Sequence, residues 1–266
     1  MNKIVLTGSV WLASDVHLGA NTPATSEAFR EFLKLAAAEA DALLLPGDIF
    51  DAWIGDDVAQ MAPAWLVQDL MALKLLASKI PVWLGRGNRD FLMGEALASG
   101  LGAKLLPDQA LIETSAGTIL LSHGDEYCVD DTAYQQFRAM VRNPLWQAGF
   151  LAKPIPERLA IAAQARGESM AANQQKTSEI MDVNEQAVSQ AMQTTGVSLM
   201  IHGHTHRPGR NILSIDGKRC ERWVLPDWEC DHVADGQTPR GGWLVIDEDG
   251  LALYDLAMND EGNGDH

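Results

Sequence analysis

Short apolar runs that end in polar segments recur through the first half of the chain. Three of them, in residues 9–15, 41–48 and 81–88 (SVWLASD, DALLLPGD and PVWLGRGN), have the length of buried strands and stop at polar or glycine-containing turns. Residues 109–125 hold two more apolar runs separated by Ala116 and Gly117, which predicts a pair of strands joined by a turn.

Between these strands the apolar residues follow a helical period. Residues 25–40 predict an amphipathic helix, and residues 62–79 predict a second one. The apolar face of the first helix carries Phe29, Phe32, Leu33 and Ala36. Strands that alternate with helices in this way predict a layered α/β fold.

Residues 127–195 interrupt the alternation, because they contain helix-like stretches broken by prolines and no strand-like run. Strand-like runs return in residues 197–206, and those in 218–228, 241–249 and 251–258 predict closing antiparallel strands. We therefore predict a core made of residues 1–126 and 196–258. A helical insertion, residues 127–195, would cap it, and residues 259–266 would form a polar tail.

The composition restricts the class of protein. The net charge of −16 argues against nucleic acid as a partner and against docking on anionic lipid through a basic patch. An odd number of cysteines, three, suits a reducing compartment, and no stretch approaches the roughly 18–20 apolar residues of a membrane span. In residues 1–15 Thr7, Gly8 and Ser9 interrupt the apolar run, so we interpret it as a strand or hairpin and not as a secretory signal. These features predict a cytoplasmic protein.

Side chains that can bind metals follow five of the predicted strands. They are Asp15, His17, Asp48, Asn88, His123 and the three histidines at alternate positions, His202, His204 and His206. In an open α/β sheet, ligands bind outside the carboxyl ends of the strands. Taken singly, Asp48 could be a turn former, Asn88 a left-handed turn residue and His123 a partly buried histidine. Taken together, they predict a site of oxygen and nitrogen ligands suited to Mn²⁺, Fe or Zn²⁺.

The ordered motifs DVH, GDIFD, GNRD, SHGD and GHTH, from residue 15 to residue 206, resemble those of the calcineurin-like metallophosphoesterases. The resemblance implies a β-sandwich flanked by helices (α/β/β/α) that holds two metal ions at the strand ends. By motif, Asp15, His17, Asp48 and His206 would bind the first ion, and Asp48, Asn88, His123 and His204 the second. His202 would be a supporting neighbour.

Five longer stretches resemble the branch of that family that hydrolyses UDP-2,3-diacylglucosamine. They are GDIFDAWIGDD (47–57), GNRDFLMG (87–94), HGDEYCVDD (123–131), IMDVN (180–184) and IHGHTHRP (201–208). This resemblance implies attack of water at the α-phosphorus, which releases UMP and 2,3-diacylglucosamine 1-phosphate (lipid X) in lipid A biosynthesis. It also implies Mn²⁺ as the usual metal and Asp48, Asn88, Arg89 and His123 as the catalytic group.

Arg89 stands where many phosphoesterases carry a histidine that protonates the leaving group. A guanidinium cannot act as a general acid near neutral pH, but it can pair with two phosphate oxygens. A pyrophosphate leaves as a phosphate and needs no such proton. The alternative for Arg89 is a surface ion pair with Asp90.

The resemblance maps substrate contacts onto the insertion and the phosphate site: Asn88, Arg89, Asp131, Ser169, Asn173, Lys176 and His204. Ser169, Asn173 and Lys176 share a helical face, which could equally be a solvated polar face. The insertion also carries the apolar residues Leu145, Trp146, Phe150, Leu151, Ile155, Leu159 and Ile161.

These apolar residues could form a cap that holds two acyl chains and rests on the cytoplasmic face of the inner membrane, assisted by Lys153, Arg158 and Arg166. The alternative is that they only pack the insertion onto the core. Two other functions stay open: a metallophosphoesterase for another nucleotide or sugar pyrophosphate, and a scaffold of this fold without catalysis.

Overall fold

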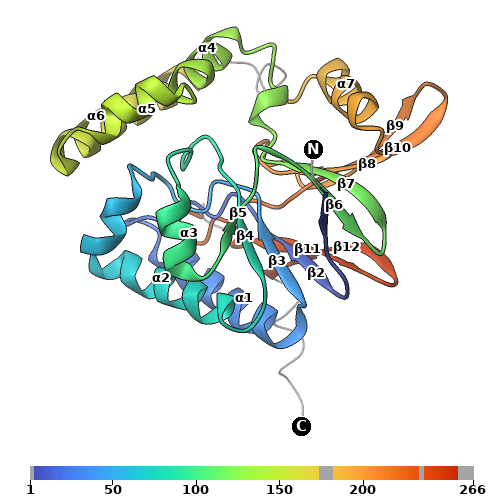
Figure 1. Cartoon of the computed structure of the whole chain (residues 1–266), viewed down its shortest axis with the longest axis horizontal. Coiled ribbons are helices and arrows are strands. Elements are labelled where there is room, and N and C mark those ends of the chain that lie inside the picture. Colours follow the sequence, from blue (N-terminus) through green and yellow to red (C-terminus); the bar gives the residue numbers. More distant parts are fainter. Residues whose placement is uncertain (1–2, 174–181, 234–236, 257–266) are drawn as a thin grey trace.

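The computed structural model describes residues 3–173, 182–233 and 237–256, with the backbone alone for residues 169–173. Its strands form two six-stranded sheets (Figure 1). In spatial order, the first sheet contains β1 (Lys3–Val5), β6 (Gln109–Thr114), β7 (Gly117–Ser122), β8 (Leu199–His202), β10 (Lys218–Val224) and β9 (Gly209–Ile215). The second contains β12 (Gly250–Asp255), β11 (Gly242–Asp247), β2 (Val10–Leu12), β3 (Ala42–Leu45), β4 (Val82–Leu84) and β5 (Lys104–Leu105).

The two sheets pack face to face because their strands are apolar on the facing side. Leu12, Leu44 and Trp83 of the second sheet join Ile119 and Ile201 of the first in one buried cluster. Strands β2, β3 and β4 run parallel to one another and are buried on both faces. This double burial explains why their sequences read as continuous apolar runs without alternation.

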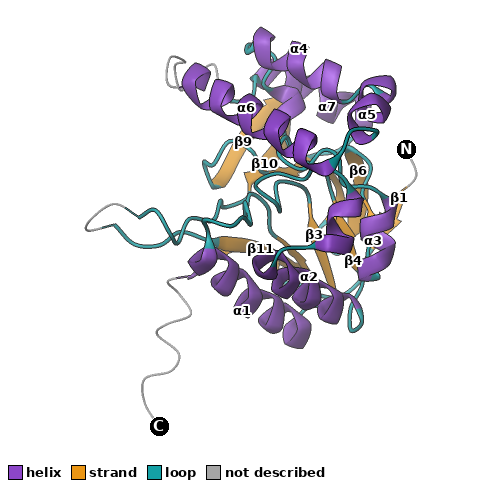
Figure 2. Ribbon diagram, turned by 90° about the vertical axis from the view of Figure 1, so that its left-hand side faces the viewer, coloured by secondary structure: helices purple, strands orange, loops and turns teal. Residues whose placement is uncertain are grey.

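A layer of three helices, α1 (Pro23–Glu39), α2 (Ala64–Ala77) and α3 (Glu95–Leu101), covers the outer face of the second sheet (Figures 1 and 2). The apolar face predicted for α1 is confirmed: Phe29, Phe32, Leu33 and Ala36 are all buried. Phe32 lies at the centre of an aromatic cluster, with ring centroids 6.0 Å from Trp11, 5.1 Å from Trp243 and 5.5 Å from Trp228.

Helix α7 (Glu185–Thr195) covers the outer face of the first sheet, where Val188 and Met192 pack against Leu120 and Met200. The molecule therefore has the predicted order of layers, helix, sheet, sheet and helix. Helices α4 (Thr132–Val141), α5 (Pro144–Leu151) and α6 (Ile155–Asn173) lie together beyond the strand ends (Figure 1). The exact division of the chain into core and insertion stays a prediction.

Three details of the chain path differ from the sequence-based expectation. β1 and β2 do not form a hairpin, because β1 pairs with β6 and β2 pairs with β3 and β11. The closing strands are shared between the sheets, and β10 is antiparallel to β9 but parallel to β8. Strand β9 was not predicted, since its exposed residues alternate with half-buried ones in a polar sequence. Within the described residues, none of the helices combines the length and the apolar character needed to span a membrane.

Replacing Phe32 tests the aromatic cluster beneath the sheet. Phe32→Ala should lower the free energy of unfolding by about 3–5 kcal/mol, because the substitution removes a buried ring and leaves a cavity. Denaturant unfolding would measure it. Met71→Ala on α2, where the side chain is 65% exposed, is the control and should change stability by less than about 0.5 kcal/mol. A small loss for Phe32→Ala would contradict the packing described here.

Candidate functional site

The predicted ligands gather where strands from both sheets end. Asp15, Asp48 and Asn88 follow β2, β3 and β4, while His123 and His204 follow β7 and β8. The segments after β2 and β3 run side by side: Asp15 N donates to Gly47 O at 3.2 Å, and His17 N donates to Asp48 O at 3.0 Å. The parallel pairing of the strands therefore continues into the loops and sets the spacing of the side chains.

An unusual backbone conformation marks these residues. Asp15, His17, Asp48, His204 and His206 all have φ between 52° and 65°, the left-handed region that residues with a side chain rarely adopt. Among the other described non-glycine residues only Asp216 has a positive φ. Strained conformations of this kind cluster at functional sites, where the surrounding structure holds them.

Two glycines of the motifs make room for the carboxylates. A Cβ at position 87 would lie 2.0 Å from Asp48 Oδ1, and a Cβ at position 203 would lie 2.1 Å from Asp15 Oδ2. Any side chain at either position would displace the neighbouring aspartate. The glycine before Asn88 and the glycine before His204 therefore allow adjacent strand ends to approach closely.

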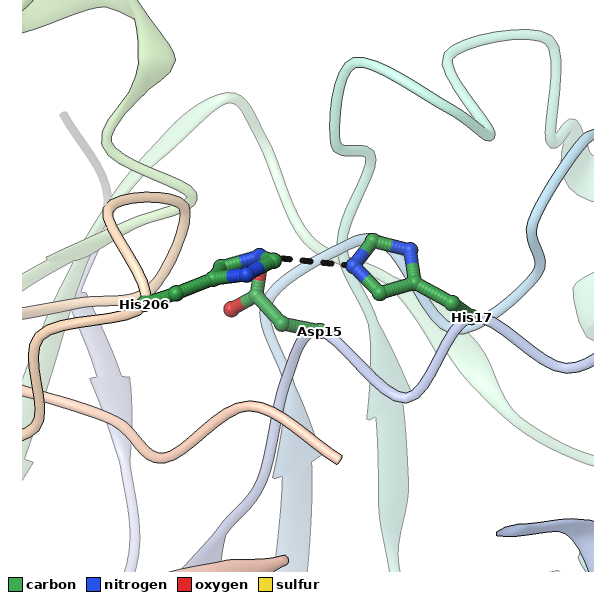
Figure 3. Close-up of side chains that lie close together, drawn as sticks. All are labelled: Asp15, His17 and His206. Carbon is green, nitrogen blue, oxygen red and sulfur yellow. Dashed lines mark hydrogen bonds and ion pairs between the residues drawn. The ribbon is translucent and has the colours of Figure 1, made fainter. Parts of the chain in front are cut away.

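Asp15, His17 and His206 form a first group of possible metal ligands (Figure 3). The Nε2 atoms of His17 and His206 face each other at 3.4 Å, and His206 Nε2 lies 3.5 Å from Asp15 Oδ1. Two imidazole nitrogens that point at one another are favourable only if one carries a proton or both bind a cation.

Asp48, Asn88, His123 and His204 form a second group. Asn88 Oδ1 lies 3.0 Å from His123 Nε2 and 2.8 Å from His204 Nδ1, and His123 Nε2 lies 3.6 Å from Asp48 Oδ2. The same Asp48 oxygen is 3.9 Å from His17 Nδ1, so this carboxylate stands between the two groups. Asp15 also comes within reach of Asp48 and His123.

The donors fit divalent metal ions. Ligand atoms bound about 2.1 Å from one ion are about 3.0–3.4 Å apart, close to the separations within both groups. Burial lowers the pKa of His17 to about 3 and that of His204 to about 4, so both imidazoles are neutral at pH 7 and can act as ligands. Burial, together with Asp90 and Asp15, raises the pKa of Asp48. A bound cation would lower that pKa again, because it stabilises the ionised carboxylate.

Asp90 of the GNRD motif holds the loops in place. It is fully buried and accepts the backbone N–H groups of Gly87, Asp48, Ile49 and Phe50 at 2.7–3.3 Å. The alternative of a surface ion pair between Arg89 and Asp90 is therefore wrong. The role of Asp90 was missed because three of its four partners are backbone groups that follow another strand, β3.

A pocket of about 870 Å³ opens from the ligands toward helices α4–α6. Asp48, Asn88, Arg89 and His204 line one part of it, and most of its wall is apolar. The apolar lining includes Phe91, Leu92, Phe137, Met140, Trp146, Phe150 and Ile161. Within the pocket wall, Arg89 Nε is buried and has no hydrogen-bond partner among the described residues.

Asp125, two residues after His123, fastens α4 over the pocket. Its Oδ2 accepts the Tyr134 hydroxyl at 2.5 Å and Arg138 Nε at 2.8 Å. The Tyr134 ring in turn stacks on His204, with centroids 6.0 Å apart. Burial alone would raise the pKa of Asp125, but His123 and Arg138 hold it well below the usual range, so the carboxylate is ionised.

Of the substrate contacts predicted in the insertion, Asp131 lines the pocket and caps α4 by accepting Tyr134 N at 3.1 Å. Ser169 and Asn173 lie in the last turns of α6, where only the backbone is described, and Lys176 lies outside the described residues. Their proposed roles stay predictions.

The apolar residues of the insertion divide into three sets. Trp146, Phe150 and Ile161 line the pocket, and Ile155 is partly buried against the core. Leu145, Leu151 and Leu159 are 84%, 41% and 54% exposed. The expectation that Arg158 would assist membrane contact is wrong, because it is buried and pairs with Asp57 and the carbonyl of Ile54. Arg166 pairs with Asp51, and Lys153 pairs with Glu157.

His202 supports the site from beneath. It is fully buried, its Nδ1 lies 2.8 Å from Gly203 O, and its Nε2 lies 3.0 Å from Arg222 Nη1. Since arginine only donates, Nε2 accepts and Nδ1 carries the proton that bonds Gly203. Both nitrogens are thus used inside the protein, which agrees with the prediction that His202 is a neighbour of the ligands.

Asp227, which follows β10, is a site residue that the sequence did not reveal. Its Oδ2 lies 3.5 Å from His206 Nδ1 and 2.8 Å from Arg240 Nη2. An aspartate after a proline has the appearance of a turn residue in the sequence.

Known proteins resemble the chain along nearly its full length. The UDP-2,3-diacylglucosamine hydrolase of Bordetella pertussis is 64% identical over 261 residues, 98% of this chain and 100% of the relative. The proteins of the same name from Xanthomonas axonopodis pv. citri and Chromobacterium violaceum are each 42% identical and cover 92% and 93% of this chain, and 98% and 99% of their own lengths. The calcineurin-like phosphoesterase family matches residues 8–208, the part of the chain that supplies all seven predicted metal ligands. The chain belongs to that family.

Proposed function

We propose that this protein hydrolyses the pyrophosphate bond of UDP-2,3-diacylglucosamine to UMP and 2,3-diacylglucosamine 1-phosphate. The observation that carries the proposal is the pocket, which joins metal-type ligands at one end to a largely apolar wall at the other. A substrate that carries both a pyrophosphate and two acyl chains fits such a pocket. The relatives that are named as hydrolases of this substrate are similar to the chain along nearly its full length.

Two divalent ions, with Mn²⁺ as the proposed metal, would be held by the two ligand groups. Asp15, His17, Asp48 and His206 would hold the first, and Asp48, Asn88, His123 and His204 the second. When bound, a pair of such ions lowers the pKa of a water molecule and neutralises charge on the phosphoryl oxygens. The chain itself contributes a rigid set of ligands, with the Asp48 carboxylate fixed by Arg89 N at 2.8 Å.

Arg89 and Asn88 would orient the phosphates. The guanidinium of Arg89 lies in the pocket wall, and its charge would stabilise the charge that develops at phosphorus as water attacks the α-phosphate. The departing 1-phosphate needs no proton from the protein, which accounts for an arginine at this position. The water supplies the oxygen gained by UMP, and its proton goes to solvent.

Helices α4–α6 would hold the lipid. Phe137, Met140, Trp146, Phe150 and Ile161 line the pocket, and acyl chains placed there would be removed from water. We propose that the exposed Leu145, Leu151 and Leu159 rest on the cytoplasmic face of the inner membrane, where the substrate resides. A soluble nucleotide would leave the apolar part of the pocket unused, and a scaffold without catalysis would not need the complete ligand set.

The Asp48 carboxylate tests the metal assignment. Asp48→Ala should abolish nearly all hydrolysis of UDP-2,3-diacylglucosamine with Mn²⁺ and reduce the Mn²⁺ content of the protein from both sites, because the carboxylate stands between the two groups. Product release and metal content after gel filtration would be measured together. Substantial activity in the variant would show that the bridge is wrongly assigned.

Arg89 should act on the substrate and not on the metals. Arg89→Ala should lower kcat/KM by about 100-fold or more, the cost seen when one donor to a developing charge is removed. Its metal content should equal that of the unchanged protein. Arg89→Lys, which keeps the charge but loses the planar pair of donors, should recover only part of the activity. Loss of metal in Arg89→Ala would contradict the proposed role.

Trp146 tests the lipid end of the pocket. Trp146→Ala should raise KM for a long-chain UDP-2,3-diacylglucosamine, because the variant loses apolar contact with an acyl chain. The rate with a short-chain analogue that does not reach α5 should change little. Leu75→Ala on α2 is the control, since this side chain is 60% exposed, does not line the pocket and is not among the residues proposed to contact the membrane. Equal effects of Trp146→Ala on both substrates would contradict acyl binding at this wall.

A further inference from the structure

We infer that Asp227 is a positioning residue that orients His206 for metal binding, and that the segment after β10 thereby completes the first metal site. The inference rests on the metal site of the proposed function. It concerns a residue outside the part of the chain that the phosphoesterase family matches, which ends at residue 208.

His206 needs an external support more than the other imidazole ligands do. Its side chain is 42% exposed, whereas those of His17 and His123 are 18% and 1% exposed. It lies in the loop after β8 with φ 53°, so neither a strand nor a helix fixes its direction. A half-exposed ring can rotate about its side-chain bonds unless its second nitrogen is held.

Asp227 faces that second nitrogen. The carboxylate lies 3.5 Å from His206 Nδ1, while Nε2 on the other side of the ring faces Asp15 and His17 (Figure 3). With a proton on Nδ1 directed to Asp227, the lone pair of Nε2 is directed to the metal. Metal-binding histidines commonly bond a carboxylate in this way, which fixes the tautomer and the ring orientation.

Asp227 is itself held rigidly. It is 6% exposed, and Arg240 Nη2 donates to the same oxygen at 2.8 Å. The next residue, Trp228, donates its backbone N–H to Asp15 O at 3.0 Å and buries its ring against Phe29 and Phe32. Residues 227 and 228 therefore contact two of the predicted ligands, the backbone of Asp15 and the side chain of His206.

The backbone of Arg240 closes this segment. It exchanges two hydrogen bonds with Glu229, at 2.8 and 2.9 Å, so the chain returns beside the site before β11 begins. The guanidinium also balances the charge of the Asp227 carboxylate. This path of the chain places Trp228 beside Asp15, a predicted ligand near the start of the sequence.

Binding of Mn²⁺ to the metal-free, full-length protein tests the inference without any substrate. Asp227→Ala should weaken Mn²⁺ binding at one site by about 10- to 100-fold, the usual effect of losing such a partner. Asp227→Asn should fall between, because its amide oxygen can still accept the Nδ1 proton without the negative charge. In the Zn²⁺-loaded protein, NMR of the histidine nitrogens should show His206 protonated at Nδ1, and Asp227→Ala should alter that signal.

Asp231→Ala is the matched control, since Asp231 lies in the same segment but, among the contacts described, its carboxylate accepts hydrogen bonds only from Ala24 and Thr25 at the start of α1. It should lower thermal stability and leave Mn²⁺ affinity unchanged. Unchanged affinity in Asp227→Ala, or equal losses in Asp227→Ala and Asp231→Ala, would overturn the inference. Failure to hydrolyse UDP-2,3-diacylglucosamine would refute the proposed function without affecting this result.

Discussion

Three buried carboxylates at neighbouring strand ends are the constraint on which the site depends. Asp15, Asp48 and Asp90 are each 2% exposed or less. Carboxylates this close repel one another and are poorly solvated, so each needs compensation from the protein or from bound cations. Within the described part of the chain, four backbone N–H groups compensate the charge of Asp90. The carboxylate of Asp48 accepts only the backbone N–H of Arg89, and its other oxygen faces imidazoles. Asp48 therefore has fewer hydrogen bonds to stabilise its charge. Binding of a cation beside Asp48 would supply that stabilisation and would also stabilise the folded loops.

The same constraint explains the backbone. To bring side chains from both sheets to one point, the chain must turn sharply directly after each strand, and five ligand residues do so in the left-handed region. Each such residue costs about 1–2 kcal/mol relative to an ordinary conformation. The cost is offset by hydrogen bonds between the loops and by ligand contacts, so these loops are stable only as an assembled set. The glycines at 87 and 203 follow from the same crowding.

These physical causes also separate what the sequence could predict from what it could not. Buried parallel strands have a strong apolar signature, and residues directly after them must meet at one edge, so the strands and the gathering of the ligands were predictable. Strand β9 is partly exposed and polar, and the sheet to which each closing strand belongs depends on long-range pairing. Arg158 had the appearance of a solvated cation, because its partner Asp57 lies 101 residues away in the chain. Asp90 was missed because most of its partners are backbone groups that follow another strand, and Asp227 because an aspartate after a proline has the appearance of a turn residue.

The helices over the pocket are tied to the loops that carry the ligands. Asp125, two residues after His123, holds α4 through Tyr134 and Arg138, while Arg158 and Arg166 join α6 to Asp57 and Asp51 in the segment that follows Asp48. A shift of those loops would therefore move the apolar wall as well as the ligands. Partly exposed charge pairs of this kind contribute little net stability, but these three join the helices to the loops at defined points. The distance between the end of the pocket that carries the candidate metal ligands and its apolar end is thus fixed by the protein, which suits a substrate whose pyrophosphate and acyl chains are joined through a single sugar.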